Sequence, residues 1–282
     1  MPISPPSAPA MALFMPHESL PQCVERGFRQ HFGGAEPGLL DATLALVQLA
    51  MATLARTDAP YHNTEHTTLV TMAGLDILRG KAMLGDTITA REWASYVASL
   101  LFHDIGYLRK LFPEDTADSV VLNTAGERFA LPAAASDAAL TAIHVDRSIA
   151  FVERNAAHFR GLDREAIVEN IENTRFPPPP LVCQSPRSRH SWPDLARAAD
   201  LIGQFGDPHY LQKLPALFAE FEECGTAQAM GLTSHQDLAA RFPRFIAELV
   251  HPLIDEGFVA LDAAPEGQRW RESLNRSVAR CK

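Results

Sequence analysis

The chain has 282 residues, of which 46% are hydrophobic and 21% are charged. A chain of this length can bury a sizeable core without disulfide bridges, and its composition is that of a globular rather than a disordered protein. Its formal net charge of −9 disfavours nonspecific binding to nucleic acid or to an anionic membrane surface. No apolar run approaches the roughly 20 residues that a membrane-spanning helix needs, so we expect a soluble protein.

The N-terminal segment, residues 1–20, is rich in proline and has no Lys or Arg before its short apolar patch. It lacks the pattern of a signal peptide and predicts a flexible leader in a cytoplasmic protein. We expect residues 1–30 to hold this leader and a first helix, and residues 31–282 to form a single domain. The widely separated cysteines form no CxxC pair, which predicts neither a disulfide framework nor a thiolate zinc site.

Apolar residues recur at intervals of three and four along most of the chain, which is typical of α-helices. No alternating strand pattern is convincing. The predicted fold class is therefore all-α, with about nine or ten helices around one main core. We expect helices at 38–56, 89–108, 117–130, 137–158, 163–174, 193–205, 208–222 and 235–260.

Two of these helices begin with a possible capping box, in which two side chains satisfy free N–H groups of the first turn. Thr89 and Glu92 form the first, and Thr233 and Gln236 form the second. The segment 176–194 contains four consecutive prolines and cannot be helical through them. Loops of this length often border a functional site, and the alternative is a tolerated surface insertion.

Residues 59–70, APYHNTEHTTLV, place His62 and His66 four residues apart. In a helix, both imidazoles would project from the same face, close enough to share a metal ion or a phosphate. Such pairs arise often by chance, so this one indicates function only in combination with other residues.

A second group of polar residues lies in strongly apolar surroundings. The run SLLFHDIGYL sets His103 beside Asp104 inside a predicted helix, and LARAADLIGQF places Asp200 in another. Burying an imidazole and a carboxylate together costs several kcal/mol unless something compensates, and a metal ion does so directly. The alternative is a salt-bridged pair in the core. With His66, these residues would give nitrogen and oxygen donors suited to zinc, iron or manganese.

This arrangement resembles the HD-domain metal phosphohydrolase superfamily, in which a His, a His-Asp pair and a distant Asp lie on helices. Within that superfamily, YHNTEH is similar to the YHNxxH signature of the class I cyclic-nucleotide phosphodiesterases. Further blocks similar to that catalytic domain follow in the same order, within residues 60–262: VVLNTAGERFA, IHVDRSIAFVER, ARAADLIGQFGDP and FIAELVHPL. The resemblance implies a phosphodiesterase-like helical bundle.

The resemblance also implies two divalent metal ions, with zinc, iron or manganese at the first site and magnesium or manganese at the second. The first ion would be held by His66, His103, Asp104 and Asp200. Asp104 would also bridge to the second ion, which would be mostly coordinated by water and would help to activate the attacking water. His62 corresponds to the general acid that protonates the leaving oxygen. Tyr61 and Asn63 would orient this corner of the site, or serve only in packing and capping.

The chain departs from the family at the groups that surround the second metal. The HDxxH pattern has a second His where this chain has Tyr107. The ENHH block keeps only its last His, as His144, with Thr141 in place of the Glu. Because such groups orient water around a metal, we expect the second ion to bind more weakly or with different partners.

A further departure concerns the base pocket. The family's QVGF segment aligns with FPRF, residues 242–245. Phe245 would stack on a purine, whereas Phe242 replaces the Gln that hydrogen-bonds the base edge; the alternative for both is core packing. The Asn that follows the last metal-binding Asp by three residues is Gly203 here. A stacking slot without a hydrogen-bonding side chain predicts relaxed base selectivity.

Together these features predict a metal-dependent phosphodiesterase that hydrolyses 3′,5′-cyclic nucleotides to nucleoside 5′-monophosphates. Its partner would be a small-molecule phosphodiester, with no nucleic acid and no membrane, and a homodimer is left open. One alternative is a nucleotidase or another phosphomonoesterase of the same superfamily. A nucleotide-binding sensor with a decayed second metal site is another. A di-iron oxygenase is disfavoured, because HD-domain oxygenases lack the YHN block.

Overall fold

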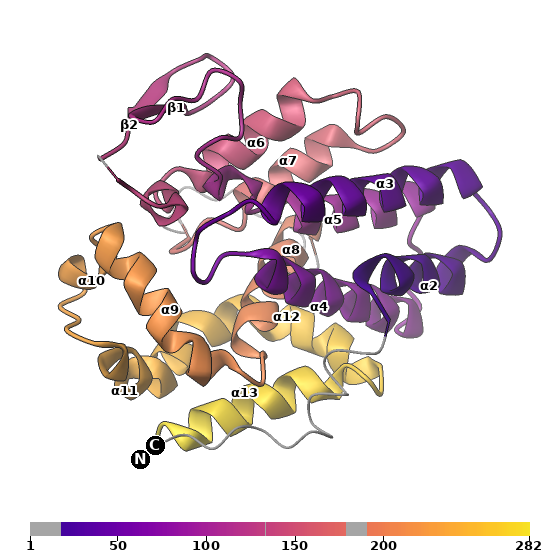
Figure 1. The fold of residues 1–282 in the computed structure, drawn as a ribbon. Helices are drawn as coiled ribbons and strands as arrows, with labels where there is room; N and C mark the ends of the chain where they lie inside the picture. Colours follow the sequence, from indigo (N-terminus) through magenta and orange to yellow (C-terminus); the bar gives the residue numbers. More distant parts are fainter. Residues whose placement is uncertain (1–17, 133, 179–190) are drawn as a thin grey trace.

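The structure is a computed structural model that describes residues 18–132, 134–178 and 191–282. It is an all-α bundle with a small β-hairpin at its edge, which confirms the predicted fold class (Figure 1). Residues 1–17 of the expected leader and residues 179–190 of the proline-rich segment lie outside the described residues. The elements in chain order are α2 (Leu20–Phe32), α3 (Pro37–Leu54), α4 (Thr64–Met83), α5 (Ala90–Phe102), η1 (Ile105–Tyr107), β1 (Ser119–Val121), β2 (Arg128–Ala130), η2 (Asp137–Leu140), α6 (His144–Arg154), α7 (Arg164–Glu172), α8 (Trp192–Phe205), α9 (Tyr210–Glu223), α10 (Thr226–Ala229), α11 (His235–Phe245), the π-helical η4 (Ile246–Val250), α12 (His251–Ala263) and α13 (Gln268–Arg280).

Helix α4 is the centre of the bundle and packs against α2, α5, α8 and α12. Its buried residues lie on several sides of the helix rather than on one stripe, because neighbours cover it from several directions. Helix α8 is buried in the same way and lies along α4. Helix α2, which follows the expected leader, belongs to the same main core through Val24 and Phe28.

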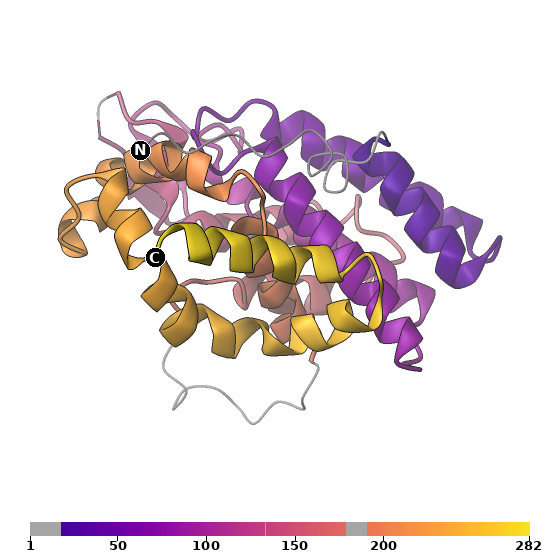
Figure 2. The ribbon, with the colours of Figure 1, turned by 90° about the horizontal axis from the view of Figure 1, so that it is seen from below.

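The C-terminal helices α12 and α13 follow each other through a short turn and close the bundle (Figures 1 and 2). Helix α12 packs on both α4 and α8, and α13 contacts α8 and α11. Trp270 of α13 is fully buried, and its indole N–H donates to the carboxylate of Asp76 at 2.8 Å. This hydrogen bond connects α13 to the central helix α4.

Helix α3 differs from the expectation that no apolar segment approaches membrane-spanning length. Over its 18 residues the mean hydropathy is 1.4, enough by length and composition to cross a membrane, and it is the one such helix among the described residues. In the bundle α3 packs against α5 and α2. Its residues Leu46, Val47 and Ala50 are buried in the main core.

The expected helix over residues 117–130 is wrong, because this segment forms the hairpin of β1 and β2. The strands are antiparallel, with Val120 opposite Phe129. The turn between them contains Gly126 at a φ of 80°, a conformation that favours glycine. The side chain of Asn123 accepts hydrogen bonds from the backbone N–H groups of Ala125 and Glu127. Two β-branched residues next to such a turn favour a strand over a helix.

Two other predicted helices are interrupted. The segment 137–158 is divided into η2 and α6, and Thr141 ends η2 by donating its hydroxyl and N–H to the carbonyl of Ala138. The segment 235–260 contains the π-helical turn η4 between α11 and α12. Pro252 follows this turn and has no N–H to bond to the carbonyl four residues earlier. The wider turn accommodates this missing bond without breaking the helix.

The first predicted capping box is confirmed, since the backbone N–H of Thr89 donates to Glu92 at 2.8 Å and the N–H of Glu92 donates back to Thr89 at 3.2 Å. The second is wrong by one residue. The box is formed by Ser234 and Asp237, because α11 begins at residue 235.

Gly203 allows α8 to lie unusually close to α4. A Cβ atom at this position would be 2.6 Å from the Cα of Val70 and 2.7 Å from its backbone nitrogen. Both contacts are with backbone, which cannot turn aside as a flexible side chain can. Gly203 follows Asp200 by one helical turn, and Val70 follows His66 by one turn. The close approach therefore brings Asp200 and His66 together.

The substitution Gly203→Ala is expected to lower the free energy of unfolding by about 1–3 kcal/mol, because the added methyl group must push α8 away from α4. The control is Gly38→Ala in α3, where nothing lies within 4 Å of the added Cβ. There alanine is expected to be neutral or slightly stabilising. Urea unfolding of both variants measures the difference, and equal stability of the two would contradict the close contact.

Candidate metal centre

Three segments bring the four predicted metal ligands together. His66 lies in the first turn of α4, which begins directly after Asn63. Asp200 lies in the middle of α8. His103 and Asp104 were expected inside a helix, but α5 ends at Phe102 and the chain then turns into η1. Both side chains therefore project from a helix end, and all four residues point into the interior of the bundle.

Each of the two carboxylates lies close to both imidazoles, as the donors to one ion would. Oδ2 of Asp104 lies 3.2 Å from Nε2 of His66 and 3.2 Å from Nε2 of His103. Oδ1 of Asp200 lies 3.4 Å and 3.6 Å from the same two nitrogens, which are 3.4 Å apart. Tetrahedral ligands with bonds of about 2.1 Å are separated by roughly 3.4 Å. The cluster therefore has the dimensions of a site for a divalent metal.

The chemistry of this cluster also suits a cation. Oδ2 of Asp104 is buried and has no hydrogen-bond partner within the described part of the chain. A buried carboxylate with an unsatisfied oxygen is costly, and a bound metal removes that cost. His103 donates its Nδ1–H to the carbonyl of Leu100 at 2.8 Å, which leaves Nε2 free to bind a metal. The residues present therefore fit the implied metal.

The charges within the cluster compensate one another in the metal-free protein. Burial would lower the pKa of His103, but the adjacent Asp104 carboxylate raises it well above its ordinary value. Burial would raise the pKa of both carboxyl groups, yet the imidazoles outweigh it. The pKa of Asp104 is held well below its usual range, and that of Asp200 falls to about 2. Two ionised carboxylates thus face the space where a divalent cation would sit.

Helix α6 holds the backbone that carries His103 and Asp104. The hydroxyl of Ser148 donates to the carbonyl of His103 at 2.6 Å and accepts from the N–H of Gly106 at 2.9 Å. The buried guanidinium of Arg147 donates to the carbonyl of Gly106 at 2.9 Å. A Cβ at Gly106 would lie 1.9 Å from the carbonyl oxygen of His144, so glycine is required for this contact with α6. The free carbonyls after α5 are thereby satisfied.

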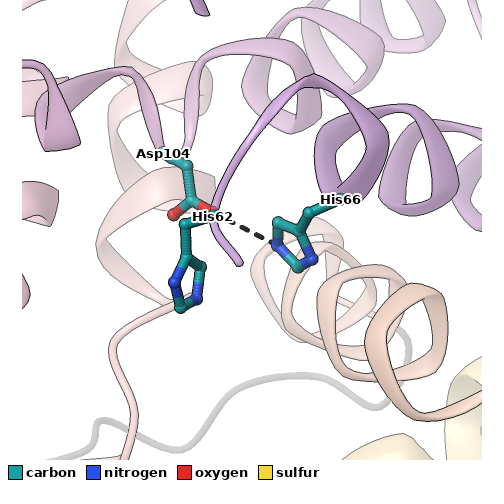
Figure 3. Close-up of side chains that lie close together, drawn as sticks. All are labelled: His62, His66 and Asp104. Carbon is teal, nitrogen blue, oxygen red and sulfur yellow. Dashed lines mark ion pairs between the residues drawn. The ribbon is translucent and has the colours of Figure 1, made fainter. Parts of the chain in front are cut away.

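His62 does not share a helix with His66, contrary to the sequence expectation, because α4 begins at Thr64. The two rings nevertheless lie 5.3 Å apart. Potential ligand atoms of His62, His66 and Asp104 all lie within 4.8 Å of one another. Figure 3 shows Asp104 directed at His66, with the imidazole of His62 beside them.

Glu220 of α9 orients His62. Its Oε1 accepts hydrogen bonds from the backbone N–H groups of Tyr61 at 2.6 Å and His62 at 3.0 Å. Its Oε2 lies 2.5 Å from Nδ1 of His62. Burial would lower the pKa of His62, but Glu220 outweighs it and the pKa is raised. Burial likewise opposes ionisation of Glu220, whose pKa is held low by His62. His62 thus keeps a proton at neutral pH more readily than a free imidazole.

Glu220 is not among the residues that the sequence predicted for the site. It lies 158 residues from His62 and is one of three acidic residues in the run AEFEE, residues 219–223. Glu222 and Glu223 follow it, and nothing in the sequence marks one of the three as buried. The only available signal is its position beside the apolar residues Leu217 and Phe218 on the predicted helix.

Tyr107 and His144 lie beside Asp104. The ring of Tyr107 stacks on His62 at a centroid distance of 4.5 Å and on His144 at 4.4 Å. Nε2 of His144 is 3.5 Å from Oδ1 of Asp104, and its Nδ1 is 2.7 Å from the carbonyl of Thr141. Burial lowers the pKa of His144. Tyr107 replaces a His of the HDxxH motif, and His144 is the one His kept from the ENHH block. These two residues therefore meet at one side of the centre.

Of the remaining residues predicted to bind substrate, some lie beside His62 and others lie in the core. Tyr61 is buried, with its ring against His62 at 5.2 Å. Asn63 caps α4 by accepting from the N–H groups of Glu65 and His66, as its capping alternative predicts. Phe242 is 2% exposed and lies in the main core, where packing accounts for it.

Phe245 is half-buried, and its ring contacts Phe205 at 5.7 Å and Phe176 at 5.8 Å. Phe205 belongs to α8, the helix that carries Asp200. Gly203, where the resemblance implied a lost polar contact, is explained by the close packing of α8 on α4.

Fold and site thus define an all-α protein with a buried His/Asp cluster that could hold a metal ion. The chain belongs to the Npun_R2479-like family, whose family model matches residues 15–282. No curated protein and no solved structure matches the chain.

The substitution Asp104→Ala is expected to remove most of the bound metal, because it deletes the oxygen closest to both imidazoles. The loss of affinity should exceed the roughly 10–100-fold that follows loss of an outer partner. His62→Ala is the matched control and should keep the metal content of the wild type. Elemental analysis after dialysis measures both, and equal metal loss in the two variants would show that His62 is itself a ligand.

The substitution Glu220→Gln is expected to lower the pKa of His62, because it removes the carboxylate that favours the protonated imidazole. Glu223→Gln is the control, since Glu223 lies on the same helix but accepts from Ser136. The pKa can be followed by NMR titration of the imidazole protons in chelator-treated protein. An unchanged pKa in Glu220→Gln would rule out this electrostatic role.

Proposed function

We propose that the protein is a metal-dependent hydrolase of phosphoric esters that acts on small phosphodiesters, with 3′,5′-cyclic nucleotides as the first candidates and relaxed choice of base. One observation carries the proposal. A four-donor metal centre and a separately anchored imidazole, His62, lie next to each other, with the rings of His62 and His66 5.3 Å apart. Hydrolysis of a phosphoric ester needs both an electrophilic centre and a proton donor for the leaving oxygen.

Zinc, iron or manganese would suit the first site, because its donors are two imidazoles and two carboxylates. When bound, such an ion would polarise the phosphoryl group and lower the pKa of a bound water. His66, His103, Asp104 and Asp200 would hold this ion. Their buried surroundings strengthen the electrostatic interactions with the substrate, because little water screens them.

His62 supplies the proton in this mechanism. Its Nδ1 is held by Glu220, so Nε2 remains to donate to the leaving oxygen. The raised pKa of His62 keeps the donating form populated at neutral pH. The side chain is 15% exposed, which leaves it accessible to a ligand. Tyr61 contacts this imidazole from the side and fixes the position of its ring.

A second candidate is a phosphomonoesterase for small substrates, and the size of a cavity favours it. The cavity that reaches His66 has a volume of only 70 Å³ and is lined also by Tyr61, Asn63 and Gly203. Pockets that enclose drug-sized ligands have roughly 300–1,000 Å³. Of the four candidate ligands only His66 lines this cavity. The cavity is too small for a whole nucleotide, which would have to bind across the outside of the centre, whereas a single phosphate group is small enough to approach His66 from it.

A comparison of substrates decides between the two. Metal-loaded protein should hydrolyse cyclic AMP, cyclic GMP or an aryl phosphodiester faster than an aryl phosphomonoester. His62→Ala should lower turnover of the best substrate by about 10²–10⁴, the scale of a lost general acid, with metal content unchanged. A preference for the monoester would favour the second candidate. Full turnover in His62→Ala would exclude the proposed proton donor, and metal binding without any hydrolysis would point to a sensor.

A further inference from the structure

The two oxygens of Asp104 face different surroundings. Oδ2 lies 3.2 Å from Nε2 of both His66 and His103, and so belongs to the first metal site. Oδ1 faces His144, whose Nε2 is 3.5 Å away. A second ion that shares Asp104 with the first would have to be bound through Oδ1, on the side of His144.

That side of Asp104 is occupied by aromatic rings. Tyr107 is 1% exposed, and its ring stacks on His144 with an interplanar angle of 18° and on His62 with an angle of 11°. Magnesium and manganese prefer about six oxygen ligands and usually retain several waters. The stacked rings of Tyr107, His62 and His144 bring one nitrogen, Nε2 of His144, to Oδ1 and add no carboxylate on this side. A neutral phenol also adds no charge to attract a cation.

The charges around the centre balance with one ion. Asp104 and Asp200 provide two negative charges, which one divalent cation neutralises. The carboxylate of Glu220 is already occupied by two backbone N–H groups and by His62. Asp207, near the other side of His66, forms an ion pair with Lys213 at 2.6 Å. A second dication beside Oδ1 would therefore be left buried without a compensating carboxylate from these residues.

We propose that this centre binds one metal ion per chain, and that Tyr107 and His144 take the place of a second ion beside Asp104. The inference rests on the metal centre of the proposed function. It replaces the expectation of two ions with a site in which aromatic packing, rather than a second cation, fixes the outer side of Asp104. Tyr107 also restrains the imidazole of His62 by stacking, and is in this sense a positioning residue.

Manganese titration counts the sites directly. The EPR signal of free Mn²⁺ is measured as metal-free protein is titrated. The wild type should bind one equivalent up to about 1 mM free Mn²⁺, a concentration high enough to fill weak sites. Tyr107→Phe should also bind one, because the ring is kept. The double variant Tyr107→His with Thr141→Glu adds an imidazole and a carboxylate, and should bind a second equivalent.

The spectrum of bound manganese provides an independent readout. Two ions about 3.5–4 Å apart are spin-coupled. The coupled pair gives hyperfine lines at about half the spacing of those from a single bound ion. A second equivalent or a coupled spectrum in the wild type overturns the inference. Binding of no manganese at all overturns it together with the metal centre. One equivalent without hydrolysis of any substrate supports the inference and removes the proposed activity, so the two failures are distinguishable.

Discussion

The site depends on one constraint, the burial of two carboxylates and two imidazoles whose facing nitrogen and oxygen atoms lie 3.2–3.6 Å apart. Such a cluster is unfavourable in an apolar core unless a cation compensates it. The fold satisfies the constraint by bringing three segments to one point: the start of α4, the end of α5 and the middle of α8. Gly203 and Gly106 permit the close backbone contacts that this convergence requires. The close packing of the central helices is thus what brings the four residues of the centre together.

The end of α5 is the part of this arrangement that needs most support. A helix end leaves carbonyl groups without partners, and here the chain immediately carries two of the metal ligands. Arg147 and Ser148 of α6 satisfy these groups, and Arg147 also pairs with Asp115 at 2.9 Å, before the hairpin. The buried guanidinium of Arg147 therefore joins the hairpin region, α6 and the segment after α5 that carries His103 and Asp104.

Three of the four candidate donors, His103, Asp104 and Asp200, could be singled out because they lie in strongly apolar sequence, and His66 only in combination with them. Asp104 and Asp200 are carboxylates in apolar sequence, where burying a charge is costly unless another group compensates it. Other features could not be predicted, because they depend on contacts between distant segments. Glu220 resembles its exposed acidic neighbours until α9 is placed against the loop before α4. The hairpin around residue 123 was predicted as a helix, because the apolar spacing there suits a short helix as well as a strand. The stack of rings on Tyr107 exists only once three segments have met.

The attachment of His62 to α9 separates two properties that a shared helix would have linked. The candidate metal ligands lie on α4, on α8 and directly after α5, whereas the orientation of His62 is set by a carboxylate on a fourth helix. In the proposed mechanism, a small displacement of α9 would reorient the imidazole of His62 while the four candidate metal ligands stayed in place. Under the proposed function, catalytic rate and metal affinity would therefore respond to different substitutions, because different helices set them.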